Sequence, residues 1–184
     1  MNLPNALTVG RIFLVPLLVV VLLTKFEGRL ILGVRKELVG AAIFGVAALT
    51  DLLDGYLARR RKQITTVGQL MDPLADKLLI AGALISLVQM DLAPAWMAAM
   101  IIGREFAVTV LRSIANGKGL VIPASSMGKL KMAAEVTAIL ALILGQVEDL
   151  KPLHVIGTVA LWFALLTATI SGVEYYRHFA RSGL

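Results

Sequence analysis

Six apolar stretches, each close to the length of a membrane-spanning helix, restrict the folds that this chain can adopt. They cover residues 7–23, 38–57, 73–90, 95–114, 130–146 and 153–176. About 20 residues of helix rise ~30 Å, which is the thickness of the hydrocarbon core of a bilayer. Segments rich in glycine, proline or charge separate the stretches and are poor helix interiors. The sequence therefore predicts an all-α polytopic membrane protein in which residues 1–184 form a single domain of six transmembrane helices.

The composition supports a membrane protein and excludes several other classes. Hydrophobic residues make up 58% and charged residues 16% of the chain, whereas an average soluble domain has ~45–50% and ~25%. The net charge of +6 and the mean hydropathy of +0.84 together suit an anionic membrane face or phosphorylated substrates, so no nucleic-acid partner is expected. The absence of cysteine excludes a disulfide framework and a thiol nucleophile. The first apolar stretch has no convincing cleavage site, so we expect the mature protein to retain it.

The basic residues predict the orientation of the six helices. An even number of spans puts both termini on one side, together with Lys118 and the basic run 59–62. Because positively charged loops stay in the cytoplasm, that side is predicted to be cytoplasmic. The segment 25–37 carries four further basic residues on the opposite side, and we expect part of it to form an interfacial helix. Trp96 and Tyr175 lie at the ends of spans, where aromatic anchors are typical.

Four aspartates stand out because they lie at the ends of apolar stretches. Asp51 and Asp54 come near the end of the second stretch, and Asp72 and Asp76 come at the start of the third. A charged residue at the centre of a membrane helix costs ~2.5–3.5 kcal/mol, and less near the interface. At 100° per residue, the two aspartates of each pair share one face of their helix. Two helices joined by a basic turn would therefore present four carboxylates to each other.

Such a group of carboxylates favours a site for a divalent cation. Like charges repel unless a cation lies among them, and oxygen ligands suit Mg²⁺ or Mn²⁺. Gly55, Ala58 and Gly68 lie on the same faces and would let a phosphorylated ligand approach the backbone, while Arg59 can bind phosphate oxygens. The alternative is a surface patch of aspartates neutralised by the basic run 59–62.

Together these residues form the pattern Asp51-x2-Asp54-Gly55-x2-Ala58-Arg59-x8-Gly68-x3-Asp72-x3-Asp76. The pattern resembles the complete signature of the CDP-alcohol phosphotransferases. These six-helix membrane enzymes transfer a phosphatidyl or related group from a CDP-linked donor to an alcohol and release CMP. The resemblance implies that two Mg²⁺ ions are bound by Asp51, Asp54 and Asp72, with Asp76 completing the metal site and acting as general base. It also implies that Gly55, Ala58, Arg59 and Gly68 line the CDP site.

Three other segments resemble one group of enzymes within this family. Residues 2–11, 103–112 and 128–131 are similar to bacterial members that couple CDP-diacylglycerol to sn-glycerol 3-phosphate. That resemblance implies a homodimer in the bacterial cytoplasmic (inner) membrane, with both termini and the active site facing the cytoplasm. Asn5 and Thr8 would reach the nucleotide, although capping of the first helix is an alternative role. Met132 and Glu135 depart from the family, which commonly has Thr and Gln there.

The basic residues of the fourth and fifth stretches are candidates for the acceptor phosphate. Arg104 and Arg112 are eight positions apart, about 80° around a helix, so both can face one cavity. A doubly charged phosphate would satisfy them. Alternatively, the cations mark the cytoplasmic side, and Glu105 is a structural counter-ion of Arg104. The predicted phosphate ligands are Arg104, Thr109, Arg112, Lys129 and Lys131.

Two other functions remain open from the sequence. One keeps the reaction and changes the acceptor, for example to inositol phosphate, serine or a phospholipid. The other is a divalent-cation transporter that uses the aspartates as its ion site, and it does not account for the small residues or for the Arg104 and Arg112 pair. A lipid donor would also require a site open sideways to the bilayer, because its acyl chains cannot leave the hydrocarbon cheaply.

Overall fold

The computed structural model describes the backbone of residues 3–25, 30–31, 33–61, 66–117 and 126–181. It describes the side chains of these residues except for 3–7, 51–61, 66–73, 116, 126–127, 129 and 178–181. Within these ranges the chain forms six long helices and a short hairpin. The elements in order are α1 (Leu3–Leu23), β1 (Leu30–Ile31), β2 (Val34–Arg35), α2 (Lys36–Arg61), α3 (Thr66–Gln89), α4 (Ala95–Gly117), α5 (Ser126–Leu144), the 3-10 turn η2 (Glu148–Leu150) and α6 (Pro152–Arg181).

Each of the six predicted stretches corresponds to one helix, so the prediction of a six-helix, nearly all-helical chain is confirmed. The largest difference is at α3, which begins at Thr66 rather than at residue 73. The hydropathy pattern stops at Asp72 because that residue is charged, but charge alone does not end a helix. As a result, Gly68 and Asp72 lie within α3, in line with Asp76.

The prediction of an interfacial helix in the segment 25–37 is wrong for the residues that the structure describes. Strands β1 and β2 pair antiparallel there, with Leu30 opposite Arg35 and Ile31 opposite Val34. Gly33 has a φ of 80°, in the left-handed region that glycine adopts without steric cost. This turn brings the chain directly into α2, whose first residue is Lys36.

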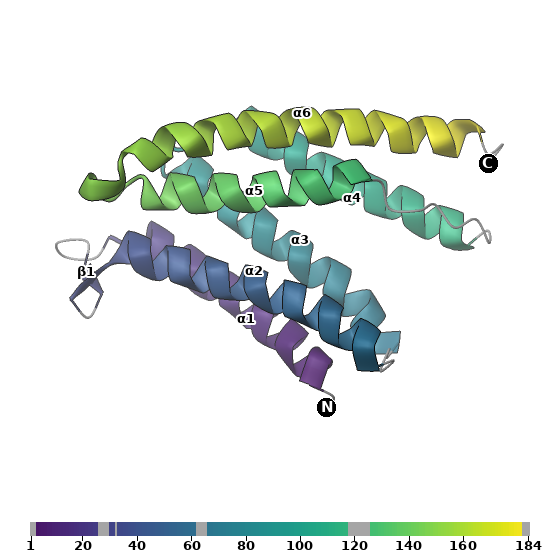
Figure 1. Cartoon of the computed structure of the whole chain (residues 1–184), viewed down its shortest axis with the longest axis horizontal. Helices are drawn as coiled ribbons and strands as arrows, with labels where there is room; N and C mark the ends of the chain where they lie inside the picture. Colours follow the sequence, from purple (N-terminus) through teal and green to yellow (C-terminus); the bar gives the residue numbers. More distant parts are fainter. Residues whose placement is uncertain (1–2, 26–29, 32, 62–65, 118–125, 182–184) are drawn as a thin grey trace.

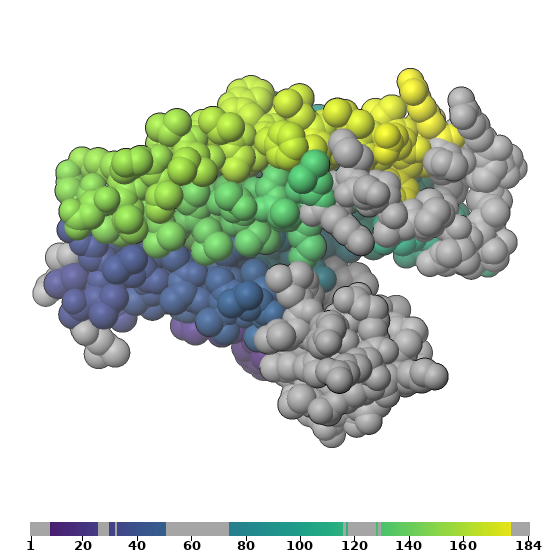
Figure 2. Space-filling view, in the orientation of Figure 1, coloured from purple at the N-terminus to yellow at the C-terminus, as the bar shows by residue number. Residues whose placement is uncertain are grey.

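The helices pack lengthwise in two groups (Figure 1). Helix α1 contacts α2 and α3, whereas α5 and α6 form the most extensive pair and α4 packs against α6 and α3. Figure 2 shows α5 and α6 lying side by side above α2 on one face of the molecule. The start of α1, the end of α2, the start of α3 and the end of α6 all lie toward the same end. The start of α1 and the described end of α6 therefore lie toward the end that carries the aspartate signature.

Helix α6 presents a long apolar face to the outside. Its segment Pro152–Arg177 is, among the described residues, the one helical segment both long and apolar enough to cross a membrane, with a hydropathy of 1.9. A shorter apolar segment, Thr8–Leu23, lies in α1. Val155, Val159 and Leu166 of α6 are 65%, 63% and 57% exposed. Large apolar side chains in such a row are typical of a surface covered by lipid or protein rather than by water.

Candidate active site

The residues of the aspartate signature occupy the last half of α2 and the first half of α3. The two helices are joined by residues 62–65, so their signature segments lie at one end of the bundle (Figure 1). Asp76 is the signature residue whose side chain the structure describes. The side chains of Asp51, Asp54, Gly55, Ala58, Arg59, Gly68 and Asp72 lie outside the described residues. Among the described side chains, no three His, Cys, Asp or Glu residues gather as a metal site.

The carboxylate of Asp76 is bound by an arginine from α1. Arg11 Nη1 donates a hydrogen bond to Asp76 Oδ1 at 2.6 Å, which also makes this contact an ion pair. The Arg11 side chain is 1% exposed, whereas that of Asp76 is 34% exposed. One oxygen of the predicted base is therefore held from inside the bundle, while the carboxyl group remains accessible.

Arg11 is a site residue that sequence reasoning missed, because it was noted only as the last residue of the segment 2–11 and was given no role of its own. A signal was present in its spacing. Thr8, Arg11, Leu18 and Leu22 recur at intervals of three, seven and four residues, and all four are buried in α1. That spacing predicts one inward face that includes the arginine. Thr8, a predicted nucleotide contact, lies one turn before Arg11, and the side chain of Asn5 lies outside the described residues.

A second polar cluster joins α4 to α6. Arg104 donates through Nε to Ala168 O at 3.2 Å and through Nη2 to Ser171 Oγ at 2.5 Å. Its Nη1 donates to Glu105 Oε1. Gly172 makes room for this side chain, because a Cβ at that position would lie 3.2 Å from Arg104 Cγ. The contacts agree with the alternative in which Glu105 is a structural counter-ion of Arg104.

The same cluster extends to α5 through Lys131. Lys131 Nζ donates to Glu105 Oε1 and lies 3.2 Å from Glu135 Oε1. Glu105 thus bridges two of the cations predicted to bind the acceptor phosphate, Arg104 and Lys131. Glu135, which stands where the family commonly has Gln, is 3% exposed and provides a second anion for Lys131. A buried cation requires such partners.

Arg112 has a different environment from Arg104. Its Nη2 donates to Tyr175 Oη at 2.7 Å, and its Cζ lies 5.4 Å from the centre of the tyrosine ring. Tyr175 was expected as an interfacial anchor but is buried. Thr109 Oγ1 donates to Glu105 O in its own helix at 2.8 Å, and the side chain of Lys129 lies outside the described residues. Arg104 and Arg112 therefore both face α6, two turns apart.

Lys77 links the two polar clusters. It follows Asp76 on α3, and its charge interacts with those of Asp76, Glu105, Arg112 and Lys131. Interactions between solvent-exposed charges are largely screened beyond a Debye length, which is about 8 Å in physiological salt. The predicted base and the predicted acceptor ligands consequently belong to one polar region rather than to separate ends of the bundle.

Comparison with known proteins identifies the family of the chain. Residues 1–170 match the family model described as CDP-alcohol phosphatidyltransferase. The chain belongs to the CDP-alcohol phosphatidyltransferase family. It is 44% identical over 180 residues to a CDP-diacylglycerol--glycerol-3-phosphate 3-phosphatidyltransferase of Bacillus subtilis, an alignment that covers 95% of this chain and 93% of the relative.

Two further similar proteins come from other bacteria. A protein of Rickettsia typhi with the same name is 36% identical, with 96% of each chain covered. A probable phosphatidylglycerophosphate synthase of Mycobacterium tuberculosis is 42% identical over 95% of this chain and 79% of its own length. The similarity therefore extends over nearly the whole chain and is not confined to the aspartate signature.

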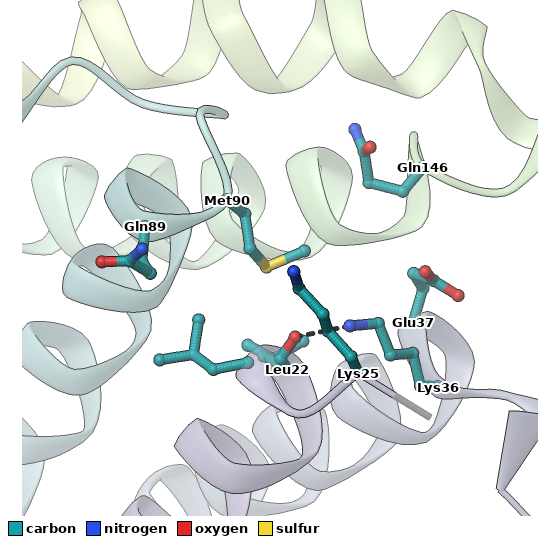
Figure 3. Close-up of a pocket in the computed structure, with 8 residues that line it drawn as sticks. Leu22, Lys25, Lys36, Glu37, Gln89, Met90 and Gln146 are labelled. Carbon is teal, nitrogen blue, oxygen red and sulfur yellow. Dashed lines mark hydrogen bonds between the residues drawn. The ribbon is translucent and has the colours of Figure 1, made fainter. Parts of the chain in front are cut away.

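A cavity of ≈ 450 Å³ lies at the end of the helix bundle opposite the aspartate signature, and Figure 3 shows the residues that line it. It is lined by the ends of α1, α3 and α5 and by the start of α2, and Lys36 Nζ donates there to Leu22 O at 2.8 Å. Gln89 of this cavity is thirteen residues beyond Asp76 on α3, roughly 20 Å away at 1.5 Å per residue. None of the predicted site residues lines it, so this cavity is not the candidate active site.

The Glu105 bridge leads to a prediction about stability. Glu105→Gln should lower the free energy of unfolding by roughly 3–5 kcal/mol, because it removes a shared anion from two mostly buried cations. Thermal unfolding of the detergent-solubilised protein measures this as a lower Tm. Glu148→Gln is the matched control: Lys151 hydrogen-bonds Glu148 and lowers the pKa of that carboxyl, but both side chains are exposed. The control should leave Tm unchanged, and equal shifts in the two variants would contradict a structural role for the bridge.

Proposed function

We propose that this chain transfers the phosphatidyl group of CDP-diacylglycerol to sn-glycerol 3-phosphate, giving phosphatidylglycerophosphate and CMP for phospholipid biosynthesis. The similarity over 95% of the chain to a relative named for this reaction carries the proposal. The complete aspartate signature supports the reaction class, because every fixed position is present at the family spacing. The polar region around Asp76 and Lys131 supports a phosphorylated acceptor.

The aspartates are proposed to hold two Mg²⁺ ions, with Mn²⁺ as a substitute. The donor set fits such ions, since carboxylate oxygens on two adjoining helix segments are hard ligands. Asp51, Asp54, Asp72 and Asp76 would be the ligands. Bound ions would hold the pyrophosphate and stabilise the leaving oxygen of CMP.

The protein's own side chains then orient the two substrates. Asp76 takes the proton from the acceptor hydroxyl, and its accessible position suits a group that meets substrate. Attack on phosphorus proceeds in line, without a covalent enzyme intermediate. The proposed CDP-binding residues are Asn5, Thr8, Gly55, Ala58, Arg59 and Gly68.

The acceptor phosphate is proposed to bind to side chains of α4 and α5. Arg112 is exposed and bonded to a neutral tyrosine, so it can approach a dianion without breaking an ion pair. Arg104 and Lys131 already converge on one carboxylate oxygen, which means that they can also converge on a phosphate oxygen if Glu105 gives way. The proposed ligands are Arg104, Thr109, Arg112, Lys129 and Lys131.

We further propose six spans in the bacterial cytoplasmic membrane, with the termini and the active site on the cytoplasmic side. The apolar outer face of α6 and exposed residues of other helices, such as Phe13 and Val110, support lipid contact. The proposed homodimer is an expectation from the family resemblance.

An acceptor panel distinguishes this function from its alternatives. Purified protein is incubated with Mg²⁺ and CDP-diacylglycerol, and CMP release is measured with glycerol 3-phosphate, inositol phosphate, serine or a phospholipid as acceptor. We expect glycerol 3-phosphate alone to support rapid release. A stronger response to another acceptor would contradict the proposed substrate. Absence of release with every acceptor, together with Mg²⁺ uptake by vesicles, would favour the transporter.

A further inference from the structure

We infer that Arg11 is a positioning residue, which holds the Asp76 carboxylate in the orientation required to accept the proton of the acceptor hydroxyl. This inference rests on the proposed function, because Asp76 is assigned as the base there. The contact joins residues 65 positions apart, so it exists only when α1 and α3 are packed together.

The burial of Arg11 indicates why the contact is firm. Arg11 is among the largest fully buried side chains of the described residues, and a buried guanidinium is strongly destabilising without an anionic partner. Asp76 provides such a partner at 2.6 Å, a short distance typical of charge-assisted hydrogen bonds. Arg11 therefore stays on Asp76 for electrostatic reasons that are independent of substrate.

The packing of α1 against α3 fixes the position from which Arg11 acts. Gly82 of α3 allows a close approach, because a Cβ there would lie 2.9 Å from Val15 Cγ1 of α1. Leu18 and Leu22 continue the same face of α1 and are 0% exposed. The backbone at Arg11 is consequently held one turn away from a tight helix contact and cannot shift relative to Asp76 without disturbing the core.

The contact with Arg11 restricts the motion of the partly exposed Asp76 carboxylate. A carboxylate that is about one-third exposed can rotate about its side-chain bonds. The hydrogen bond from Arg11 to Oδ1 restricts that rotation. A misplacement of ~1 Å in a reacting group can slow a reaction on the order of 10²-fold. Loss of Arg11 should therefore appear in kcat more than in substrate binding.

The first test compares Arg11→Met and Arg11→Lys with the parent enzyme. We expect Arg11→Met to lower kcat by about 10- to 100-fold, with the KM values of both substrates changing by less than about threefold. Arg11→Lys keeps the charge and should recover part of kcat. Leu18→Ala is the matched control, because it weakens the same face of α1 without touching Asp76. It should lower Tm and leave the kcat of the folded enzyme unchanged.

The second test is a double-mutant cycle with Asp76→Asn. If Arg11 acts through Asp76, then Arg11→Met should change kcat by less than about twofold in the Asp76→Asn background. If the losses in kcat of the two single variants multiply in the double variant, the inference is wrong. It is also wrong if Arg11→Met changes only the KM values. Near-normal turnover of Asp76→Asn itself would instead overturn the assignment of the base, so the two failures are distinguishable.

Discussion

Asp76→Asn should slow turnover at least ~10²-fold while leaving a folded protein that binds CDP-diacylglycerol. Asparagine has nearly the same shape as aspartate and can still accept the hydrogen bond from Arg11, but it cannot take a proton from the acceptor hydroxyl. Single-turnover formation of CMP measures the chemical step, and binding of a CDP-diacylglycerol analogue checks the donor site. Near-normal turnover would remove Asp76 from the role of base.

Two other signature variants provide the contrast to Asp76→Asn. Asp51→Ala and Asp72→Ala should lose Mg²⁺-dependent donor binding as well as turnover, because alanine removes the proposed ligand oxygens altogether, whereas Asp76→Asn keeps one side-chain oxygen that can coordinate a cation. Titration with Mg²⁺, with donor binding as the readout, distinguishes loss of the metal site from loss of the base. Titrations identical to those of the parent would contradict the metal assignment.

Arg112→Ala should raise the KM for glycerol 3-phosphate about 10- to 100-fold and change the KM for CDP-diacylglycerol little. A hydrogen bond to a charged group contributes ~1.5–3 kcal/mol, which corresponds to this range. Because the described partner of Arg112 is the neutral Tyr175, the variant leaves no buried charge behind. Arg104 differs, since its three contacts with α4 and α6 mean that Arg104→Ala should also lower Tm.

Tyr175→Phe is the matched control for Arg112→Ala. It removes the hydroxyl that accepts a hydrogen bond from Arg112 but leaves the cation, so the KM for glycerol 3-phosphate should change much less. Free glycerol, which lacks the phosphate, should be a very poor acceptor for the parent. Equal use of glycerol and glycerol 3-phosphate would contradict the acceptor site, as would Arg104→Ala and Arg112→Ala variants that weaken only the donor.

Helices were predictable from the sequence because apolar residues dominate long uninterrupted stretches. The β1–β2 hairpin was not, since two strands of two residues each leave no recognisable alternation, and the charges of segment 25–37 equally suit a helix. The start of α3 was misplaced for a related reason. Hydropathy locates the continuous apolar part of a helix, whereas residues 66–72 are helical although Gly68, Gln69 and Asp72 interrupt their apolar residues.

The candidate site was predictable where chemistry is local in the sequence and not where it depends on packing. The four aspartates are visible as a pattern within residues 51–76. The contacts Arg11 to Asp76 and Arg112 to Tyr175 join residues more than 60 positions apart, and only the packed helices bring them together. The pair of Lys131 and Glu135 was also missed, although its spacing of four residues on one helix is visible in the sequence.

Transfer of radiolabelled glycerol 3-phosphate into a lipid product tests the central claim most directly. The purified protein is incubated with CDP-diacylglycerol, labelled glycerol 3-phosphate and Mg²⁺, and both the organic-phase label and the released CMP are counted. We predict equal amounts of labelled phosphatidylglycerophosphate and CMP, and neither product with Asp76→Asn or after chelation of the metal. CMP released without label in the lipid, or labelled lipid formed equally well by Asp76→Asn, would contradict the account.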